Sequence, residues 1–368
     1  MTQRVALFSP YALSVFGGVQ EQALAMSREL GRRGHQVLLV APDASDQNRY
    51  DTPAQVRRLG RLWSLPANGS RAPLTLSPWA ARRAHEAVKK FRPDVVHFHE
   101  PFAPLLGWAT LCAHDAAAVA TFHRSGDGPA LRLTGPLLRY LARNLDGSAA
   151  VSQAAASTIS KAAGLQAEVF SNGFEMERFA ETPRERGADP TVLYIGRLEE
   201  RKGVRHVIGA VMAHNARGGD QWRLVVLGDG PQRAQLEDLA LPDRLILFVG
   251  AVSDADKRAW LRRAHVLVAP STRGESFGLI LLEAMASELV VVASDIEGYR
   301  EAVGDFGLLF APGDQAALES AITTALAGET SEAMAAAKAH AEHWSMSRLV
   351  DQYEVLYAHA RDRFQAGK

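Results

Sequence analysis

The sequence predicts an α/β protein made of two doubly wound domains, each with a parallel sheet covered by helices on both faces. Short apolar segments alternate along the chain with amphipathic segments of about ten residues or more. This rhythm is typical of parallel strands, because each parallel connection needs a crossover, usually a helix. A length of 368 residues is too great for one ordinary hydrophobic core and suits two.

The first domain is predicted over residues 1–175. Its expected strands are residues 5–9, 36–41, 94–99, 118–122, 148–151 and 168–170. Between them, apolar residues recur at helical spacing over residues 19–33, 78–91 and 131–144.

The second domain is predicted over residues 188–343, after a polar stretch at 173–190 that indicates a linker. Its expected strands are residues 191–195, 222–227, 245–249, 266–269 and 290–293. An alanine-rich helical tail follows from 331 to 364, with a break expected at Trp344-Ser345.

Composition limits the environments in which this chain is expected. Lys and Arg total 41, as do Asp and Glu, so no overall field draws the chain to nucleic acid or to a membrane. Cys112 is the only cysteine, which excludes an intrachain disulfide and fits a reducing cytoplasm. We see no secretory signal and no apolar run of about 18 residues, so we expect a cytoplasmic protein.

The segment 273–283 gives the strongest indication of chemistry. Glu275 and Glu283 stand on either side of a glycine turn that follows a buried-strand pattern and opens an apolar helix at Phe277. The free N–H groups of a helix start can bind an anion, and carboxylates accept hydrogen bonds from hydroxyls. An anion and a polyol together describe a nucleotide sugar. Taken alone, the two glutamates would fit ordinary helix residues, one of them favouring the helix dipole.

Two cations follow the first strand of the second domain. Arg197 stands at the strand end, where its guanidinium can meet phosphate oxygens bidentately. Lys202 stands at a helix start, where a cation opposes the helix dipole and a bound anion would resolve the conflict. The alternative is a solvated charged loop, the role assigned to Arg201.

Glycine turns and a histidine mark other strand ends. Gly17 and Gly18 open the first long helix without the third glycine of a dinucleotide fingerprint, and Gly228 lies in a similar turn. His123 ends a strand and can bind a sugar hydroxyl or a charged oxygen. His97 and His99 superficially resemble a metal cluster. Two residues on one strand supply only two ligands, so we expect no metal.

Together these segments resemble the retaining glycosyltransferases of family 4 over nearly the whole chain. The likeness extends to the actinobacterial members that mannosylate phosphatidylinositol. It rests on Tyr11 and on residues 17–20, 66–70, 99–101, 120–123 and 274–278. The resemblance implies the GT-B architecture, in which two Rossmann-like domains face each other across a cleft and a last helix, 347–368, crosses back onto the first domain.

The resemblance also implies a donor site, for GDP-mannose in those members. Arg197 and Lys202 would neutralise the leaving diphosphate, and Glu275 and His123 would orient the transferred sugar. Glu283 would hold the ribose. The other implied donor residues are Gly17, Gly18, Gly228, Asp254, Lys257, Ser276, Phe277 and Gly278.

The acceptor side departs from the family pattern. The implied acceptor residues are Tyr11, Gln20, Asn68, Arg71 and Arg124. Ser14 stands where those enzymes carry an aspartate, Arg124 where they carry a threonine, and Pro73 where a basic residue belongs. Phosphatidylinositol is therefore one acceptor among several.

The implied activity is metal-independent transfer of a hexose, with retention, to a hydroxyl acceptor, without a cofactor. A UDP- or ADP-sugar with another acceptor is the first alternative. A sugar-nucleotide epimerase or hydrolase, and a non-catalytic nucleotide-sugar-binding partner, are the others. The oligomeric state is left open.

One helix of the first domain is a candidate for peripheral contact with the inner membrane face. Residues 78–91 combine Trp79 with several Arg and Lys residues, and such a helix can lie on anionic headgroups. An ordinary solvated surface helix is the alternative interpretation.

Overall fold

The computed structural model describes residues 2–14, 17–42, 52–67, 70–103, 105–124, 126, 129–180, 185–275, 277–328 and 330–367. The side chains of residues 64–72 and 129–133 are outside this description. The chain divides into two compact units, of which the first comprises residues 1–174 and 346–368 and the second residues 175–345. The segment 175–187, part of the stretch expected to be a linker, falls in the second unit.

The first unit contains a seven-stranded sheet with the order β3-β2-β1-β6-β7-β8-β9. Neighbouring strands in it pair in parallel, in agreement with the predicted fold class. Its strands are β1 (Arg4–Phe8), β2 (Gln36–Ala41), β3 (Gln55–Arg58), β6 (Val95–His99), β7 (Ala117–Phe122), β8 (Gly147–Ala150) and β9 (Glu168–Val169). A separate antiparallel pair, not expected from the sequence pattern, is formed by β4 (Trp63–Ala67) and β5 (Ser70–Leu74).

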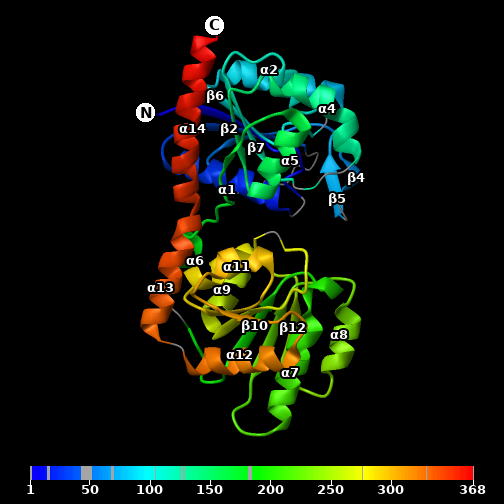
Figure 1. Cartoon of the computed structure of the whole chain (residues 1–368), viewed down its shortest axis with the longest axis vertical. Coiled ribbons are helices and arrows are strands. Elements are labelled where there is room, and N and C mark those ends of the chain that lie inside the picture. The colour runs from blue at the N-terminus through cyan, green and yellow to red at the C-terminus, as the bar shows by residue number, and fades with distance from the viewer. Residues whose placement is uncertain are drawn as a thin grey trace. The chain divides into compact units, whose positions relative to one another are not determined.

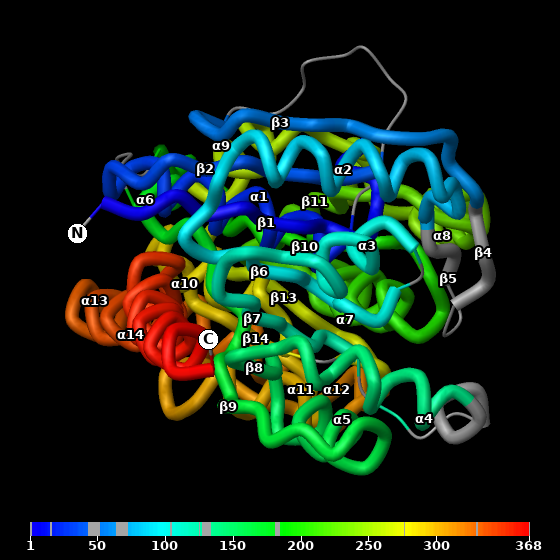
Figure 2. The backbone as a smooth tube through the Cα atoms, turned by 90° about the horizontal axis from the view of Figure 1, so that it is seen from above, coloured from blue at the N-terminus to red at the C-terminus, as the bar shows by residue number. Residues whose placement is uncertain are grey.

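Helices cover both faces of this sheet (Figures 1 and 2). The helices are α1 (Gly18–Arg32), α2 (Pro78–Phe91), α3 (Trp108–Leu111), α4 (Pro129–Ala142), α5 (Gln153–Ala163) and α14 (Met346–Ala366). Alternate strand residues face opposite sides, so Val5 and Leu7 pack with α1 and α14, whereas Ala6 and Phe8 pack with α2 and α3. The last helix thus forms part of the first unit, as the family resemblance implies.

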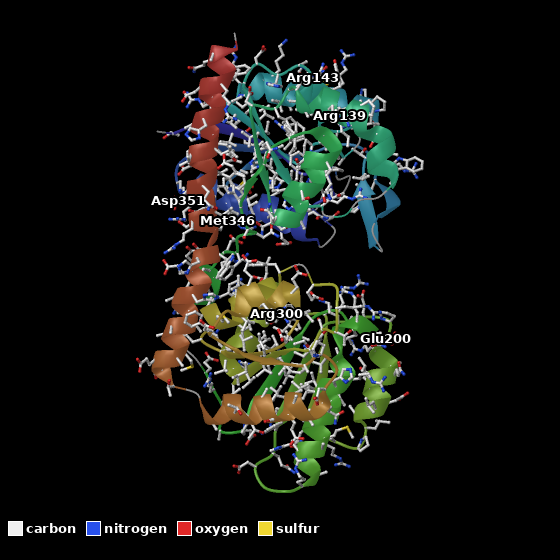
Figure 3. All side chains as sticks on the ribbon, in the orientation of Figure 1. Arg139, Arg143, Glu200, Arg300, Met346 and Asp351 are labelled. Carbon is white, nitrogen blue, oxygen red and sulfur yellow. The ribbon has the colours of Figure 1, made fainter. Side chains whose placement is uncertain are left out.

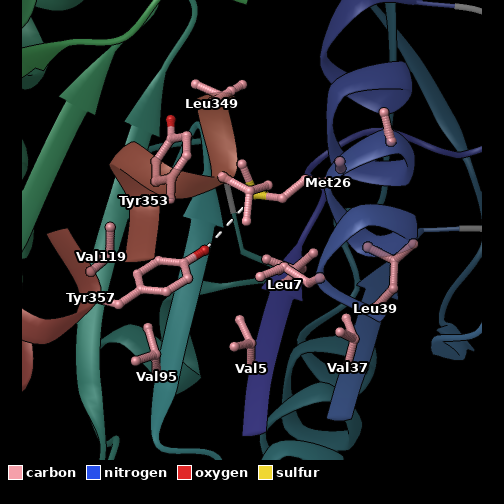
Figure 4. Packing of buried hydrophobic residues seen from close by; sticks show 14 of the residues in the cluster. Val5, Leu7, Met26, Val37, Leu39, Val95, Val119, Leu349, Tyr353 and Tyr357 are labelled. Carbon is pink, nitrogen blue, oxygen red and sulfur yellow. Dashed lines mark hydrogen bonds between the residues drawn. The ribbon is translucent and has the colours of Figure 1, made fainter. Parts of the chain in front are cut away.

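Helix α14 is tied to the sheet by a buried polar chain. The Tyr357 hydroxyl lies 2.7 Å from Nδ1 of His97, whose Nε2 lies 2.7 Å from the hydroxyl of Thr121. The Thr121 hydroxyl also lies 2.6 Å from that of Tyr353. Tyr357 further contacts Met26 of α1, so it joins two helices to two strands (Figure 4). This packing gives each buried polar group a partner, which avoids the cost of an unpaired one.

The second unit contains a six-stranded parallel sheet with the order β12-β11-β10-β13-β14-β15. Its strands are β10 (Thr191–Ile195), β11 (Arg223–Leu227), β12 (Ile246–Gly250), β13 (Val266–Ala269), β14 (Val290–Ser294) and β15 (Leu308–Phe310). Its helices are α6 (Glu177–Ala180), η1 (Glu200–Lys202), α7 (Val204–Ala216), α8 (Arg233–Ala240), α9 (Asp254–Arg263), α10 (Leu279–Ala286), α11 (Glu297–Val303), α12 (Gln315–Ala327), α13 (Ser331–Ala341) and η2 (Glu342–Trp344).

Both faces of this second sheet are also covered. Helices α7, α8 and α12 share a core cluster with Val192 and Tyr194 of β10, while α9, α10 and α11 contact β10, β13 and β14. The expected break at Trp344-Ser345 is present, because η2 ends at Trp344 and α14 begins at Met346. Figure 3 labels Met346 and Asp351 near that start.

Each sheet has one switch point, at which the order of successive strands across the sheet reverses its direction. In the first sheet it lies between β1 and β6, and in the second between β10 and β13. Loops that follow such strands diverge and leave a crevice at the carboxyl edge of the sheet, where ligands of doubly wound proteins bind. The two switch points therefore mark where functional residues are expected. Among the described residues, no helix combines the length and apolar character needed to cross a membrane.

We predict that Tyr357→Ala destabilises the first unit by about 3 kcal/mol or more, because it leaves a cavity and an unpaired His97 nitrogen. Val355→Ala is the matched control on the same helix, since Val355 is exposed. Urea unfolding, followed by circular dichroism, measures both. Equal midpoints for the two variants would contradict the proposed role of this helix in the core.

Candidate functional site

The switch point of the second sheet brings two loops into contact. Residues 196–203 follow β10 and residues 270–278 follow β13, and these strands are neighbours. A Cβ on Gly203 would lie 2.2 Å from the carbonyl oxygen of Pro270, and Gly203 has a φ of 68°. Only glycine satisfies both conditions, so the turn that ends with Lys202 can lie directly against the loop that carries Glu275.

Glu275 is bound by two cations from the β10 loop. Its Oε1 lies 2.7 Å from Nζ of Lys202 and 2.7 Å from Nη1 of Arg201. The Ser271 hydroxyl donates to the same oxygen at 3.3 Å, and the Tyr299 hydroxyl donates to Ser271 at 3.0 Å. Within the part of the chain that the structure describes, Oε2 has no hydrogen-bond partner. Glu275 is thus oriented through one oxygen while the other can accept a hydrogen bond from a ligand.

Arg201 is not the solvated surface charge expected from the sequence. Besides binding Glu275, its Nη1 donates to the carbonyl of Gly274 at 3.1 Å, and its Nε donates to Glu199 at 3.1 Å. Its own carbonyl accepts from the backbone N–H of Thr272 at 2.8 Å. Side chain and main chain of Arg201 therefore both fasten the β10 loop to the β13 loop. A signal that could have found it is the pair of adjacent cations in one short turn facing a glutamate loop.

Arg197 is placed differently from Lys202. Its side chain is 70% exposed, and its Nε lies 3.2 Å from Glu199. Exposed ion pairs of this kind contribute little to stability, so Arg197 is available to a ligand at small cost. The structure thus brings Lys202 and Arg201 to Glu275 and leaves Arg197 in solvent beside them.

A second cluster surrounds Glu283. Nζ of Lys257 lies 2.8 and 3.0 Å from the two carboxylate oxygens, and it lies 3.5 Å from Asp254. Arg178 contacts Asp254 at 2.6 Å, and Arg258 contacts the same carboxylate. Burial raises the pKa of Glu283, an effect that the charge of Lys257 opposes. Three of the implied donor residues, Glu283, Lys257 and Asp254, therefore form one cluster, with Arg178 as an additional member.

The positions of the other predicted donor residues are mostly determined by packing contacts. Phe277 is buried against Trp344, with ring centroids 5.7 Å apart. Gly278 caps α10 at a φ of 82°, and a Cβ there would lie 2.6 Å from the ring of Tyr299. A Cβ on Gly228 would lie 1.9 Å from the carbonyl oxygen of Gly196, so that glycine lets two strand-end turns approach. Ser276 lies outside the described residues.

The carboxyl edge of the first sheet carries a pair of buried histidines. Nδ1 of His99, at the end of β6, lies 3.0 Å from Nε2 of His123, just after β7. Glu100 adopts a left-handed conformation at a φ of 49°, and its Oε1 accepts from the backbone N–H groups of His123 and Arg124 at 2.5 and 2.7 Å. Such a conformation is uncommon for glutamate and is compensated here by the two hydrogen bonds. His123 is thereby held in place from two sides.

Burial keeps these histidines neutral. It lowers the pKa of His99 to about 4 and lowers that of His123 well below its ordinary value, with His99 a further cause. A single N–H that forms a hydrogen bond between the two neutral rings explains the 3.0 Å distance between His99 and His123. The outer nitrogen of His99, Nε2, is buried without a partner among the described residues. It lies beside a small cavity of about 10 Å³ lined also by Ser9 and Glu100, enough for one water molecule.

No group of three or more potential metal ligands occurs among the described residues. His97 in particular is occupied by Tyr357 and Thr121, so its nitrogens serve the buried chain to α14. That the protein needs no metal stays a prediction.

The predicted acceptor residues fall into two groups. Tyr11 and Gln20 are described: burial raises the pKa of Tyr11 to about 12, with Glu100 a further cause, and the buried Gln20 amide donates to Ala12 at 3.5 Å. Gly17 caps α1, which begins at Gly18, and a Cβ on Gly17 would crowd the Gln20 amide at 2.5 Å. Asn68 lies outside the described residues, as does the side chain of Arg71.

Each of the two units matches the model of a known protein family. Residues 16–178 match the model described as Glycosyltransferase Family 4, and residues 175–344 match the model described as Glycosyl transferases group 1. Two relatives, each named phosphatidyl-myo-inositol mannosyltransferase, cover most of the chain. The protein from Mycobacterium leprae is 34% identical and the alignment covers 96% of this chain and 97% of the relative. The protein from Mycolicibacterium smegmatis is 33% identical over 96% and 94%.

Solved structures share the fold. A glycosyltransferase from Rickettsia africae superposes with a TM-score of 0.74 at 15% identity, covering 98% of each chain. The Anabaena protein HepE, solved with UDP and glucose, superposes with a TM-score of 0.68 at 19% identity, covering 96% of this chain and 98% of that one. These likenesses confirm the predicted architecture of two Rossmann-like domains.

We predict that the free energy of unfolding falls as the pH is lowered from 6.5 toward 4. The folded-state pKa of His99 is depressed, so over this range the unfolded chain binds a proton that the folded chain excludes. For His99 alone the loss is about 3 kcal/mol. The measurement is urea unfolding at a series of pH values for the wild type and for His99→Gln.

As the pH is lowered, the free energy of unfolding of the wild type should fall by about that amount more than that of His99→Gln, since only the wild type contains the titrating ring. His343→Gln, which changes an exposed histidine of the second unit, is the control and should leave the pH dependence unchanged. Parallel profiles for the wild type and His99→Gln would show that His99 is not held neutral by burial.

Proposed function

The chain belongs to the glycosyltransferases of family 4, and from this premise we propose that it transfers mannose from GDP-mannose to phosphatidylinositol or a related glycolipid. The transfer would proceed with retention of the anomeric configuration and without a metal ion. Support for the substrates comes from the names of the two mycobacterial relatives, which align with nearly the whole chain. A different hexose donor, such as a UDP- or ADP-sugar, is the alternative.

The observation that carries this proposal is the charge arrangement around Glu275. Lys202 and Arg201 place two positive charges beside one carboxylate at the carboxyl edge of the sheet, and Arg197 adds a third, exposed cation nearby in sequence. A diphosphate brought to this edge would find cations already oriented, which is the condition for stabilising charge that develops during a reaction. A carboxylate with one oxygen held and one open would accept hydrogen bonds from sugar hydroxyls.

The proposed chemistry follows from these charges. The bond between C1 of mannose and the phosphate oxygen breaks, and a bond from the acceptor oxygen to C1 forms on the same face. The departing phosphate takes the acceptor's proton, so no carboxylate nucleophile is required. Arg197 and Lys202 stabilise the negative charge that accumulates on the diphosphate. Glu283 and Lys257 lie together where the ribose and base are proposed to bind.

We propose that Arg201 acts as a positioning residue in this reaction. It contacts Glu275 and the carbonyl of Gly274 rather than standing toward solvent, and it is only 35% exposed. When the diphosphate attracts Lys202, Arg201 would keep Glu275 in place. A rigid support of this kind maintains the geometry that transfer requires.

The proposed membrane contact is through helix α2. Trp79 is 64% exposed, and the guanidinium of Arg83 lies 4.7 Å from the centre of its ring. Arg82 is also exposed, and the last turn adds Lys89 and Lys90. An aromatic side chain among exposed cations fits a surface of anionic headgroups, where a lipid acceptor would be found.

The experiment that tests the donor is calorimetric titration with GDP, UDP and ADP, without metal and then with Mg²⁺. We expect GDP to bind in the absence of metal and more tightly than the other two. Incubation with GDP-mannose and phosphatidylinositol should then give a mannosylated lipid whose anomeric configuration is read by NMR. Preference for UDP or ADP would replace the donor, and strict Mg²⁺ dependence would reject metal independence.

We predict that Glu275→Ala and Lys202→Ala each lower kcat/KM by about a thousandfold while the fold is retained, because each removes a contact proposed for the transition state. Arg201→Gln should lower kcat more than it raises KM, as expected for a residue that positions another. The control is Arg217→Gln at the far end of α7, which also removes an arginine ion pair. Near wild-type turnover in Glu275→Ala would reject the site.

We predict that the triple variant Trp79→Ala, Arg82→Gln, Arg83→Gln loses about tenfold or more of its binding to vesicles of phosphatidylinositol and phosphatidylcholine, since each basic residue near an anionic surface contributes about 1 kcal/mol. The control pair is Arg139→Gln with Arg143→Gln at the end of α4, labelled in Figure 3. Flotation of vesicles measures binding. Equal losses for both sets would mean that overall charge, and not helix α2, determines binding.

A further inference from the structure

The first unit contains a cavity at the edge of the sheet opposite the histidine pair. It has a volume of about 400 Å³, within the range of small-molecule sites. Its walls come from the second half of α2, the segment that enters β6, and the segment between α3 and β7. Val96 stands near the start of β6 and lines the cavity, whereas His99 ends the same strand. The cavity is therefore separate from the predicted catalytic residues.

Two polar atoms in the wall of the cavity lack partners. The Thr110 hydroxyl makes no hydrogen bond among the described residues, and neither does Nδ1 of His85. By contrast, both ring nitrogens of His114 are engaged by the carbonyl oxygens of Ala116 and Asn144. Thr110 has no exposed surface, so its hydroxyl lies behind the wall and does not itself reach the interior of the cavity. What the cavity can bind is therefore determined by the charged and apolar residues that line it.

The charges that line the cavity favour an anion. Lys89 and Arg92 supply two positive charges against the single carboxylate of Asp115. Arg92 ends α2 at a φ of 52°, a left-handed conformation in which glycine is favoured. An arginine at such a position places a guanidinium at the rim of the cavity despite the less favourable backbone.

The remaining walls are apolar. Val88, Val96, Ala113 and Ala116 line the cavity between the polar groups. An occupant of this cavity therefore needs an anionic group for Lys89 and Arg92 and an apolar body. A phosphate has the oxygens to meet both a guanidinium and an ammonium.

We propose that this cavity is a second ligand site, which binds a phosphate group carried on a small apolar body. The source of that group is either a soluble phosphomonoester or the headgroup of a phospholipid, since α2 also bears the residues proposed to meet a membrane. Neither source is the nucleotide sugar, because the donor residues implied in the first unit, Gly17, Gly18 and His123, do not line this cavity.

The test is titration of the whole protein with phenyl phosphate, which combines the two required chemistries, by isothermal calorimetry. Lys89→Gln and Arg92→Gly should each weaken binding about tenfold. The control is Lys90→Gln, which removes the same charge from the adjacent residue that does not line the cavity, and it should bind like the wild type. Arg92→Gly is also suited to the local backbone, so a loss of binding in it is not explained by misfolding.

The two sources are distinguished by competition. If the natural ligand is a soluble phosphomonoester, phosphatidylinositol vesicles should leave phenyl phosphate binding unchanged, and if it is a headgroup they should displace phenyl phosphate from the wild type. Absence of phenyl phosphate binding, or equal weakening by Lys89→Gln and Lys90→Gln, would overturn the proposal.

Discussion

The geometry of the parallel sheet is the constraint on which the rest of this structure depends. All strands of one sheet point the same way, so their following loops meet at one edge, and at a switch point two neighbouring loops turn to opposite faces. The loops after β10 and β13 are such neighbours. Residues as distant in sequence as Lys202 and Glu275 become partners for this reason. Gly203 permits the approach because no side chain separates its turn from Pro270.

The positive charges at this edge are compensated by a carboxylate of the protein itself. Glu275 shares one oxygen between Lys202 and Arg201, so the cations are neutralised locally and oriented at the same time. Removing only one member of such a partly buried group leaves an uncompensated charge. The stability lost in this way is greater than the stability that the intact pair contributes. Glu283 and Lys257 repeat this arrangement a short distance along α10. Both clusters combine rigidity with polar groups that a ligand can engage.

The sequence predicts the fold class because strand and helix patterns differ in period, and the two sheets contain the expected strands with small shifts at their ends. It does not predict β3, since residues 55–58 lack a buried apolar run and face solvent at alternate positions. The positions of Glu275 and Lys202 at strand-end loops follow from the pattern. The contacts of Arg201 do not, because the direction of a side chain in a tight turn depends on backbone dihedral angles that the pattern does not give. Likewise, His85 and Thr110 share a cavity only through the packing of α2 against α3.

The place of α14 affects the order in which this protein can fold during its synthesis. The core of the first unit needs Tyr353 and Tyr357, yet the ribosome adds them only after the whole of the second unit. The second unit is continuous in sequence and has every element of its sheet before residue 346 emerges. The nascent chain must therefore hold an incomplete first unit, with the surface for α14 uncovered, while the later unit forms. Exposed apolar surface of this kind is what chaperones bind, so their protection would matter most in this interval.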